Sequence, residues 1–202
     1  MDSKVPTLVI GLTGGLGAGK SVVAGILRSM GYPVYDADSA AKRLYDVDPV
    51  LLGAVADRFG PAILDDAGLL DRQQLAALVF GNPGALAKLN GLVHPAVARD
   101  FRGWLSHHGA CGRQVVFREA AILFESGAHE GCDRVWGVSA PRALRVERVR
   151  KRSGLTEAEI ALRMSRQWPQ ERVLDHCDSV LVNDGLKPLV PQVKHLVSEF
   201  PV

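Results

Sequence analysis

The chain has 202 residues, of which 47% are hydrophobic and 23% are charged, a composition typical of one globular domain with a sizeable core. Its 24 basic and 22 acidic residues leave a net charge of +2, which argues against a general binder of nucleic acids or membranes. The three cysteines are far apart and form no C-x-x-C pair, so a disulfide framework is not expected and a reducing compartment is favoured.

The start and the apolar segments of the chain show no pattern of a signal peptide or a membrane span. Residues 1–6 do not resemble a secretory signal, and no stretch approaches the ~18 apolar residues of a membrane span. We therefore expect a cytoplasmic protein that acts without a membrane or nucleic-acid partner.

Short apolar runs alternate with helical patterns along the chain. The first run, 8–13, ends in a glycine-rich turn and precedes a helix over 20–30, which Gly31 ends. Further strands are expected at 33–36, 114–117, 134–138 and 179–183. Further helices are expected from Pro141 towards 152, from a capping box of Thr156 and Glu159 towards 167, and at 186–199. This alternation predicts a doubly wound α/β fold with a parallel sheet.

Residues 38–107 predict mainly helix, because apolar residues recur there at spacings of three and four between turn signals. We interpret this stretch as a helical insertion on the core sheet. The expected organisation is one domain over 7–201, with a core of 7–47, 110–140 and 178–201, a helical region at about 48–109 and a lid at about 141–170.

Residues 14–21 match the phosphate-binding pattern G-x-x-x-x-G-K-[ST] at every fixed position. Glycines let successive backbone N–H groups converge on phosphate oxygens, and the following helix points its positive end at the anion. Lys20 should reach the β- and γ-phosphates, and the Ser21 hydroxyl should bind Mg²⁺. A chance glycine-rich turn is disfavoured by the strand and helix on either side, but the pattern does not separate a kinase from a GTPase or ATPase. The expected nucleotide-binding residues are Gly14, Gly15, Gly17, Ala18, Gly19, Lys20, Ser21 and Val22.

Four carboxylates lie at or beyond the carboxyl ends of predicted strands. Asp36 and Asp38 lie at the carboxyl end of the second strand, the edge at which open α/β sheets bind ligands, and a kinase needs a carboxylate there to accept the proton of a hydroxyl. They should point in different directions, so at most one is the base, and capping of the next helix is an equal alternative. Glu119 follows the third strand, where P-loop enzymes assist Mg²⁺ through water. Glu125 is a second candidate, although both glutamates could be exposed loop acids.

Basic residues gather on the helix expected after Pro141. Arg148 and Arg152 are four residues apart and share a face, as expected of a lid that closes over a transferring phosphate. A solvated basic face that pairs with Glu147 is one alternative, and nucleic-acid binding is a weaker one because interleaved aromatic residues are lacking. The cluster consists of Arg142, Arg145, Arg148, Arg150, Lys151 and Arg152.

The order and spacing of these motifs resemble the dephospho-CoA kinase family over nearly the whole chain. The phosphate loop from Gly11 to Ser21 carries most of the resemblance. Val22, Glu119 and Ala121 depart from the residues common in the family, which are Thr, Asp and Pro. The other similar segments are Asp36-Ala37-Asp38, His94-Pro95 at the end of a helical region, Ile122-Leu123-Phe124-Glu125, Arg163 and Gln167 in the lid, and Asn183-Asp184-Gly185 near the nucleotide base.

The resemblance implies a P-loop three-layer α/β/α fold with a parallel five-stranded sheet, a helical substrate-binding insertion at about 48–109 and a helical lid. It also implies ATP- and Mg²⁺-dependent phosphorylation of the 3′-hydroxyl of dephospho-CoA by a monomer or weak homo-oligomer. A nucleoside or nucleotide kinase of the same fold, a nucleotide-driven switch and an RNA-binding module remain alternatives, although no N-K-x-D guanine motif is present. The implied roles are base for Asp38, phosphoryl stabilisation for Lys20, Arg148 and Arg152, substrate contact for Asp38, His94 and Glu125, metal contact for Ser21 and Glu119, and nucleotide contact for Asn183.

Overall fold

The structure is a computed structural model that describes residues 6–200. It contains two compact units: a sheet unit, made of the described residues up to Asp36 and from Leu105 onward, and a helical unit, Ala37–Trp104. The helical unit begins about one helix earlier than the helical region expected from the sequence, because α2 (Ala37–Val47) packs on α3 (Pro49–Phe59). Residues 1–5 and position 201, the expected end of the domain, lie outside the described residues.

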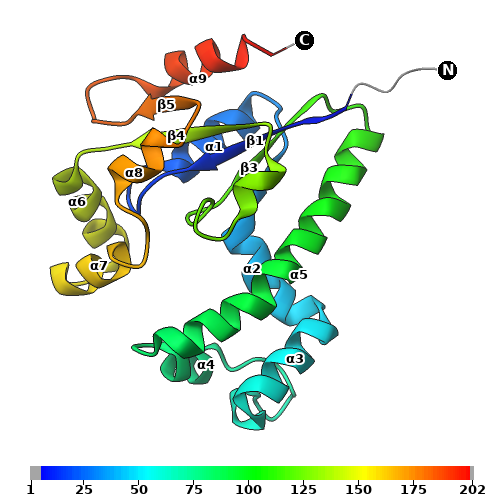
Figure 1. The fold of residues 1–202 in the computed structure, drawn as a ribbon. Coiled ribbons are helices and arrows are strands. Elements are labelled where there is room, and N and C mark those ends of the chain that lie inside the picture. Colours follow the sequence, from blue (N-terminus) through cyan, green and yellow to red (C-terminus); the bar gives the residue numbers. More distant parts are fainter. Residues whose placement is uncertain (1–5, 201–202) are drawn as a thin grey trace. The chain divides into compact units, whose positions relative to one another are not determined.

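The sheet unit is built on five parallel strands in the order β2-β3-β1-β4-β5 (Figure 1). The central strand β1 is largely apolar, and its neighbours β3 and β4 are apolar over 115–117 and 135–138, as is typical of strands buried on both faces. The α/β fold with a five-stranded parallel sheet is therefore confirmed. The strands are β1 (Leu8–Thr13), β2 (Val34–Asp36), β3 (Val115–Glu119), β4 (Arg134–Ser139) and β5 (Ser179–Val182).

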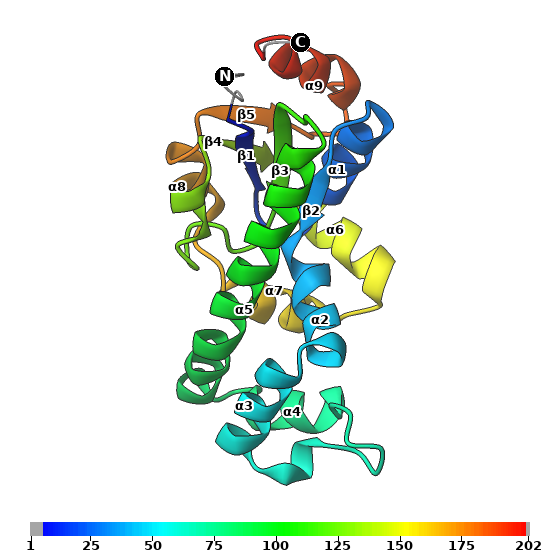
Figure 2. The ribbon, with the colours of Figure 1, turned by 90° about the vertical axis from the view of Figure 1, so that its right-hand side faces the viewer.

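Different segments cover the two faces of the sheet (Figure 2). On one face, α1 (Lys20–Ser29) and α9 (Leu189–Val197) pack over a core that includes the fully buried Phe117 and Trp136. The other face is covered by α8 (Gln170–Asp175) and by residues 120–133. A Cβ on Gly137 would approach Leu174 of α8 to 2.7 Å, so this glycine permits close packing of helix on strand.

Aspartates close the amino ends of two strands. The Asp133 carboxylate accepts a hydrogen bond from Val9 N at 2.7 Å, and the Asp178 carboxylate accepts one from Val135 N at 2.7 Å. Both aspartates thereby satisfy backbone donors where β1 and β4 begin. The opposite, carboxyl edge of the sheet is where the glycine-rich turn follows β1.

The helix ends in the sheet unit follow the sequence signals closely. Gly31 has a φ of 87° and ends α1 in a Schellman arrangement, since its N–H bonds Arg28 O and Tyr32 N bonds Leu27 O. The capping box at the start of α7 (Glu157–Met164) is confirmed. However, α7 ends at Met164 instead of near 167, and α8 was not predicted. The basic helix α6 is Arg142–Ser153.

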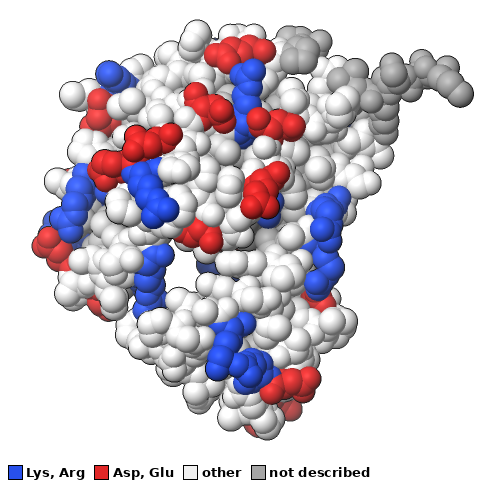
Figure 3. All heavy atoms as spheres, in the orientation of Figure 1, with Lys and Arg blue, Asp and Glu red and all other residues white. Residues whose placement is uncertain are grey.

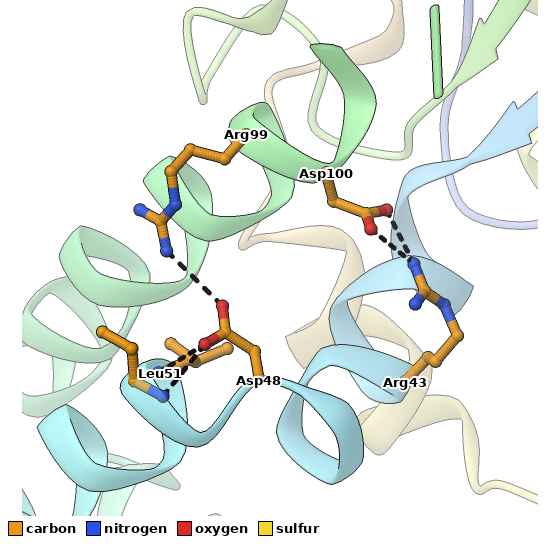
Figure 4. Close-up of polar contacts among 6 residues, drawn as sticks. Arg43, Asp48, Leu51, Arg99 and Asp100 are labelled. Atoms are coloured by element: carbon orange, nitrogen blue, oxygen red, sulfur yellow. Dashed lines mark hydrogen bonds and ion pairs between the residues drawn. The ribbon is translucent and has the colours of Figure 1, made fainter. Parts of the chain in front are cut away.

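The helical unit contains α2, α3, α4 (Arg72–Val79) and most of α5 (Pro83–Ala110). Figure 4 shows how ion pairs join its helices: Arg43 contacts Asp100 at 2.7 Å, and Arg99 contacts Asp48 at 3.5 Å. Asp48 also caps α3 by accepting from Leu51 N. Because the arginines are half exposed, each pair contributes at most about 1 kcal/mol.

His94 and Pro95 lie inside α5, so their expected position at the end of a helical region is wrong. Proline removes one backbone donor from a helix, but the 28-residue α5 continues past it on both sides.

Among the described residues, no helix combines the length and the apolar character needed to cross a bilayer.

Candidate nucleotide-binding site

The glycine-rich turn leaves the carboxyl end of the central strand β1 and leads directly into α1. Gly17 and Gly19 have φ values of 79° and 104°, which side chains rarely allow, and a Cβ on Gly14 would lie 2.5 Å from Val138 O. Gly19 is the N-cap of α1 and makes no side-chain cap. The helix terminus is thus left to interact with an anion, as in a phosphate-binding loop.

Lys20, the first residue of α1, has its ammonium group folded back onto the loop. Its Nζ donates to Gly14 O at 2.8 Å, so the cation is held at the mouth of the turn. The Val22 side chain is 56% exposed, and its backbone N bonds Gly19 O within the first helical turn. The structure therefore gives Lys20 a position beside a phosphate site, while nucleotide contact by Val22 stays a prediction.

Ser21 and Glu119 face one another across the base of the loop. Ser21 Oγ donates to Glu119 Oε1 at 3.2 Å, and Asp36 pairs in register with Glu119 on the neighbouring strand. Glu119 is the last residue of β3 and is buried, so its expected position after the strand is corrected. Burial, and then the charge of Asp36, raise the pKa of Glu119, whereas Lys20 lowers it.

This donor set fits a hard divalent cation. A hydroxyl and carboxylates are the oxygen ligands that Mg²⁺ accepts, and a cation would relieve the repulsion between the Glu119 and Asp36 carboxylates. Within residues 6–200 no group of three His, Cys, Asp or Glu side chains could hold a metal ion unaided. Any Mg²⁺ here would need water and phosphate oxygens in addition, as is usual for nucleotide-bound Mg²⁺.

Asn183, just after β5, ties the loop to the basic helix α6. Its Nδ2 donates to Ala18 O at 2.8 Å, and its Oδ1 accepts from Arg148 Nη2 at 3.1 Å. A Cβ on Gly19 would collide with the Asn183 amide. Asn183 and Arg148 are therefore brought together at the loop, while nucleotide contact by Asn183 and phosphoryl stabilisation by Arg148 stay predictions. Arg152 is exposed in the last turn of α6, and its role stays a prediction.

A second set of contacts joins the loop to the turn between α7 and α8. Gln167 Oε1 accepts from Leu16 N at 2.8 Å, and its Nε2 donates to Ala121 O at 2.9 Å. The Glu125 carboxylate accepts from Trp168 N at 2.8 Å. Substrate contact by Glu125 thus stays a prediction, and what the structure shows is an anchor for this turn. The sequence placed Gln167 in the lid, but nothing in the sequence pointed to its bond with the loop.

Asp38 and His94 belong to the helical unit. Asp38 is exposed in the first turn of α2, and chain connectivity keeps its Cα within about 7 Å of the Asp36 Cα. His94 is half-buried in α5, and burial lowers its pKa, which favours the neutral imidazole. Their expected roles are compatible with these positions and stay predictions.

A comparison with protein families matches residues 8–188 to the model described as dephospho-CoA kinase. The chain belongs to the dephospho-CoA kinase family. Curated dephospho-CoA kinases include one from Chlorobaculum tepidum, which is 40% identical over 97% of this chain and 96% of its own length. Another, from Bacteroides fragilis, is 37% identical over 94% of this chain and 91% of its own length.

Solved structures share the fold of this chain. TT1252 from Thermus thermophilus superimposes with a TM-score of 0.83 at 36% identity, covering 97% of this chain and 99% of its own. Dephospho-CoA kinase from Campylobacter jejuni gives a TM-score of 0.69 at 23% identity and covers 95% and 96%, which supports the fold alone. A shikimate kinase from Bacteroides thetaiotaomicron shares the fold more distantly, with a TM-score of 0.51 and 13% identity over 95% and 97% of the two chains.

Proposed function

We propose that this protein transfers the γ-phosphoryl group of ATP to the 3′-hydroxyl of the ribose of dephospho-CoA, giving CoA and ADP, the last step of coenzyme A synthesis. The observation that carries the proposal is a complete phosphate loop, with Lys20 and Ser21 beside Glu119, in a chain that matches the dephospho-CoA kinase family over residues 8–188. Family membership supplies the acceptor, and the loop supplies the means of holding the donor.

The residues at the loop divide the work of binding and charge stabilisation. Backbone N–H groups of the loop and the terminus of α1 bind the phosphates of ATP. Lys20 exchanges its bond with Gly14 O for the β- and γ-phosphates and stabilises the charge that develops during transfer. Arg148 and Arg152, one helical turn apart on α6, provide further donors from the lid.

Ser21 and Glu119 would hold Mg²⁺, Ser21 directly and Glu119 through water. The metal, when bound, neutralises charge on the phosphates of ATP. The raised pKa of Glu119 supports this assignment, because the chain brings this carboxylate out of water next to Asp36 without a nearby cation strong enough to reverse the shift.

Asp38 is the general base in this proposal. Its carboxylate accepts the proton of the 3′-hydroxyl as the ribose oxygen bonds to the γ-phosphorus and the bond to ADP breaks. Its exposed place in the first turn of α2, two residues after the β2 edge, supports access to an acceptor. Asp36, which pairs in register with Glu119, is the less suitable of the two for this role.

The helical unit would bind dephospho-CoA, with His94 on α5 as a contact. Glu125 is a separate proposed substrate contact. This unit has a cavity of about 390 Å³ between the ends of α3, α4 and α5. Two cations, Arg58 and Lys88, lie beside apolar Phe59 and Leu78 in its lining. Such a lining suits a ligand with anionic and apolar parts, which describes a diphosphate joined to a pantetheine arm.

We also infer a cytoplasmic monomer or weak homo-oligomer that needs no nucleic-acid or membrane partner. The face shown in Figure 3 has Lys and Arg interspersed with Asp and Glu, so it offers no continuous basic surface to RNA. An RNA-binding protein would show an affinity for RNA that falls steeply as the salt concentration rises.

The test is a coupled ADP-release assay with ATP, Mg²⁺ and each of three acceptors: dephospho-CoA, adenosine and AMP. Release that depends on dephospho-CoA, with CoA as product, is expected. Release with another acceptor would keep the kinase and overturn the substrate. Slow release that is independent of acceptor, together with tighter binding of guanine than adenine nucleotides, would favour a nucleotide-driven switch.

A further inference from the structure

One arginine of helix α6 is buried, and the proposed mechanism gives it no role. Arg145, in the first turn of α6, is only 8% exposed, whereas its neighbours Arg142 and Arg150 are exposed. Its Nε is buried and has no hydrogen-bond partner among the described residues. A buried cation normally has a paired acid or several acceptors, so this one calls for an explanation.

Arg145 packs directly on the phosphate loop. A Cβ built on Gly15 would collide with the Arg145 guanidinium, and one on Gly17 would lie 2.5 Å from Arg145 O. Two loop glycines therefore fit against the two ends of one residue. The loop cannot move towards α6 without displacing this guanidinium.

The charge of Arg145 is poorly compensated within the chain. Glu171 acts favourably on it from a distance and Arg142 unfavourably, but burial dominates and lowers the pKa of Arg145. Within the described part of the chain no carboxylate lies within 4 Å of its guanidinium to form an ion pair. An apolar side chain of similar length would fill this space at a lower desolvation cost.

We propose that Arg145 supplies buried positive charge to the phosphate site through the loop on which it packs, and that bound nucleotide phosphates provide the missing countercharge. Arg145 is then a positioning residue: it holds Gly15 and Gly17 and raises the potential at the site without touching ATP. The inference rests on ATP binding at the loop, as proposed above. It explains why a costly buried cation stands beside an anion site and not elsewhere in the core.

The test measures ATP affinity by calorimetry, without Mg²⁺, and the thermal midpoint of the nucleotide-free protein. Arg145→Met should weaken ATP binding about 10- to 30-fold, the range for unit charges roughly 8–12 Å apart at an effective dielectric constant of about 20. The same variant should keep or raise the thermal midpoint, because it replaces an unpaired buried charge with an apolar side chain. The loss should be smaller for ADP, which carries less charge.

Two variants serve as controls. Arg145→Lys keeps the charge and should retain most of the ATP affinity, and Arg142→Met removes an exposed charge from the same helical turn and should change the affinity little, since solvent screens it. Wild-type affinity in Arg145→Met would overturn the inference while leaving the kinase proposal intact. Equal losses in the Met and Lys variants, with lowered thermal midpoints, would show a packing role alone and also overturn it. A wild-type protein that does not bind ATP would refute both proposals.

Discussion

The bond between Gln167 and the phosphate loop allows a sharp prediction about how the turn between α7 and α8 prepares the nucleotide site. Gln167→Ala removes two hydrogen bonds, the 2.8 Å bond from Leu16 N and the 2.9 Å bond to Ala121 O. Each is worth about 1 kcal/mol, so the loss of stability should be about 2 kcal/mol, or a fall in the thermal midpoint of roughly 4–8 °C for a chain of this size.

Only the bond to Leu16 bears on ATP. Without this bond, ATP binding has to order the loop. If the ordering costs the about 1 kcal/mol that the hydrogen bond contributes, the affinity for ATP falls roughly fivefold. We therefore expect the KM for ATP to rise about fivefold, while the KM for dephospho-CoA stays unchanged. Steady-state kinetics with each substrate varied in turn would measure both values.

A matched control is Gln170→Ala, because Gln170 lies in the same segment and also accepts a backbone N–H, that of Ala140, at 3.2 Å. This variant should lose stability without a change in the KM for ATP. An unchanged or lowered KM for ATP in Gln167→Ala would refute the reasoning. A lowered KM would mean that Gln167 competes with phosphate for the Leu16 N–H, and an unchanged KM would mean that the bond does not prepare the loop.

Three further predictions concern the same site. Gly15→Ala should lower the thermal midpoint, since its Cβ meets the buried Arg145 guanidinium, and the added Arg145→Ala should restore part of the loss in a melting experiment. Glu119→Gln should stabilise the nucleotide-free protein at neutral pH and raise the Mg²⁺ concentration needed for the half-maximal rate. Because the pKa of Glu119 is raised in the folded protein, the wild-type free energy of unfolding should fall as the pH rises from about 4.5 through the folded pKa, and this fall should be lost in the variant. The same pH profile of stability in both proteins would contradict the raised pKa. Asp38→Asn should keep ATP affinity but lower kcat by about 10²- to 10⁴-fold, and an unchanged kcat would exclude Asp38 as the base.

Much of the sheet unit could be predicted because its signals are local. Buried parallel strands appear as continuous apolar runs, and the loop pattern fixes residue type at each position of a backbone turn. The capping box of Thr156 and Glu159 and the glycine at Gly31 are likewise contacts between near neighbours in the chain. Such signals can be read in one sequence, and the structure confirms them.

The contacts that brace the loop could not be predicted, because they join residues far apart in the sequence. Leu16 and Gln167 are 151 residues apart, and Ala18 and Asn183 are 165 residues apart. Arg145 lies in a basic helix, and the sequence does not distinguish it from the exposed arginines around it. Which of these arginines is buried depends on how the helix is rotated about its axis when it packs on the loop. Periodicity also missed α8, which has only six residues.

The His94-Pro95 error has a related cause. The resemblance to the family puts this pair at the end of a helical region, and a proline within a helix usually ends or kinks it. In the structure α5 continues through Pro95, with Val93, Ala96 and Val97 buried on its packed face. Burial of that face outweighs the lost hydrogen bond, a tertiary effect that local propensity does not contain.

The most direct measurement of the central claim follows the phosphoryl group itself. ATP labelled in the γ-phosphate is incubated with Mg²⁺, dephospho-CoA and the purified protein, and the products are separated and the labelled position is identified. We expect the label on the ribose 3′-oxygen of CoA, and no transfer of label by the Lys20→Ala variant. Label released only as inorganic phosphate, or found on another acceptor, would contradict it.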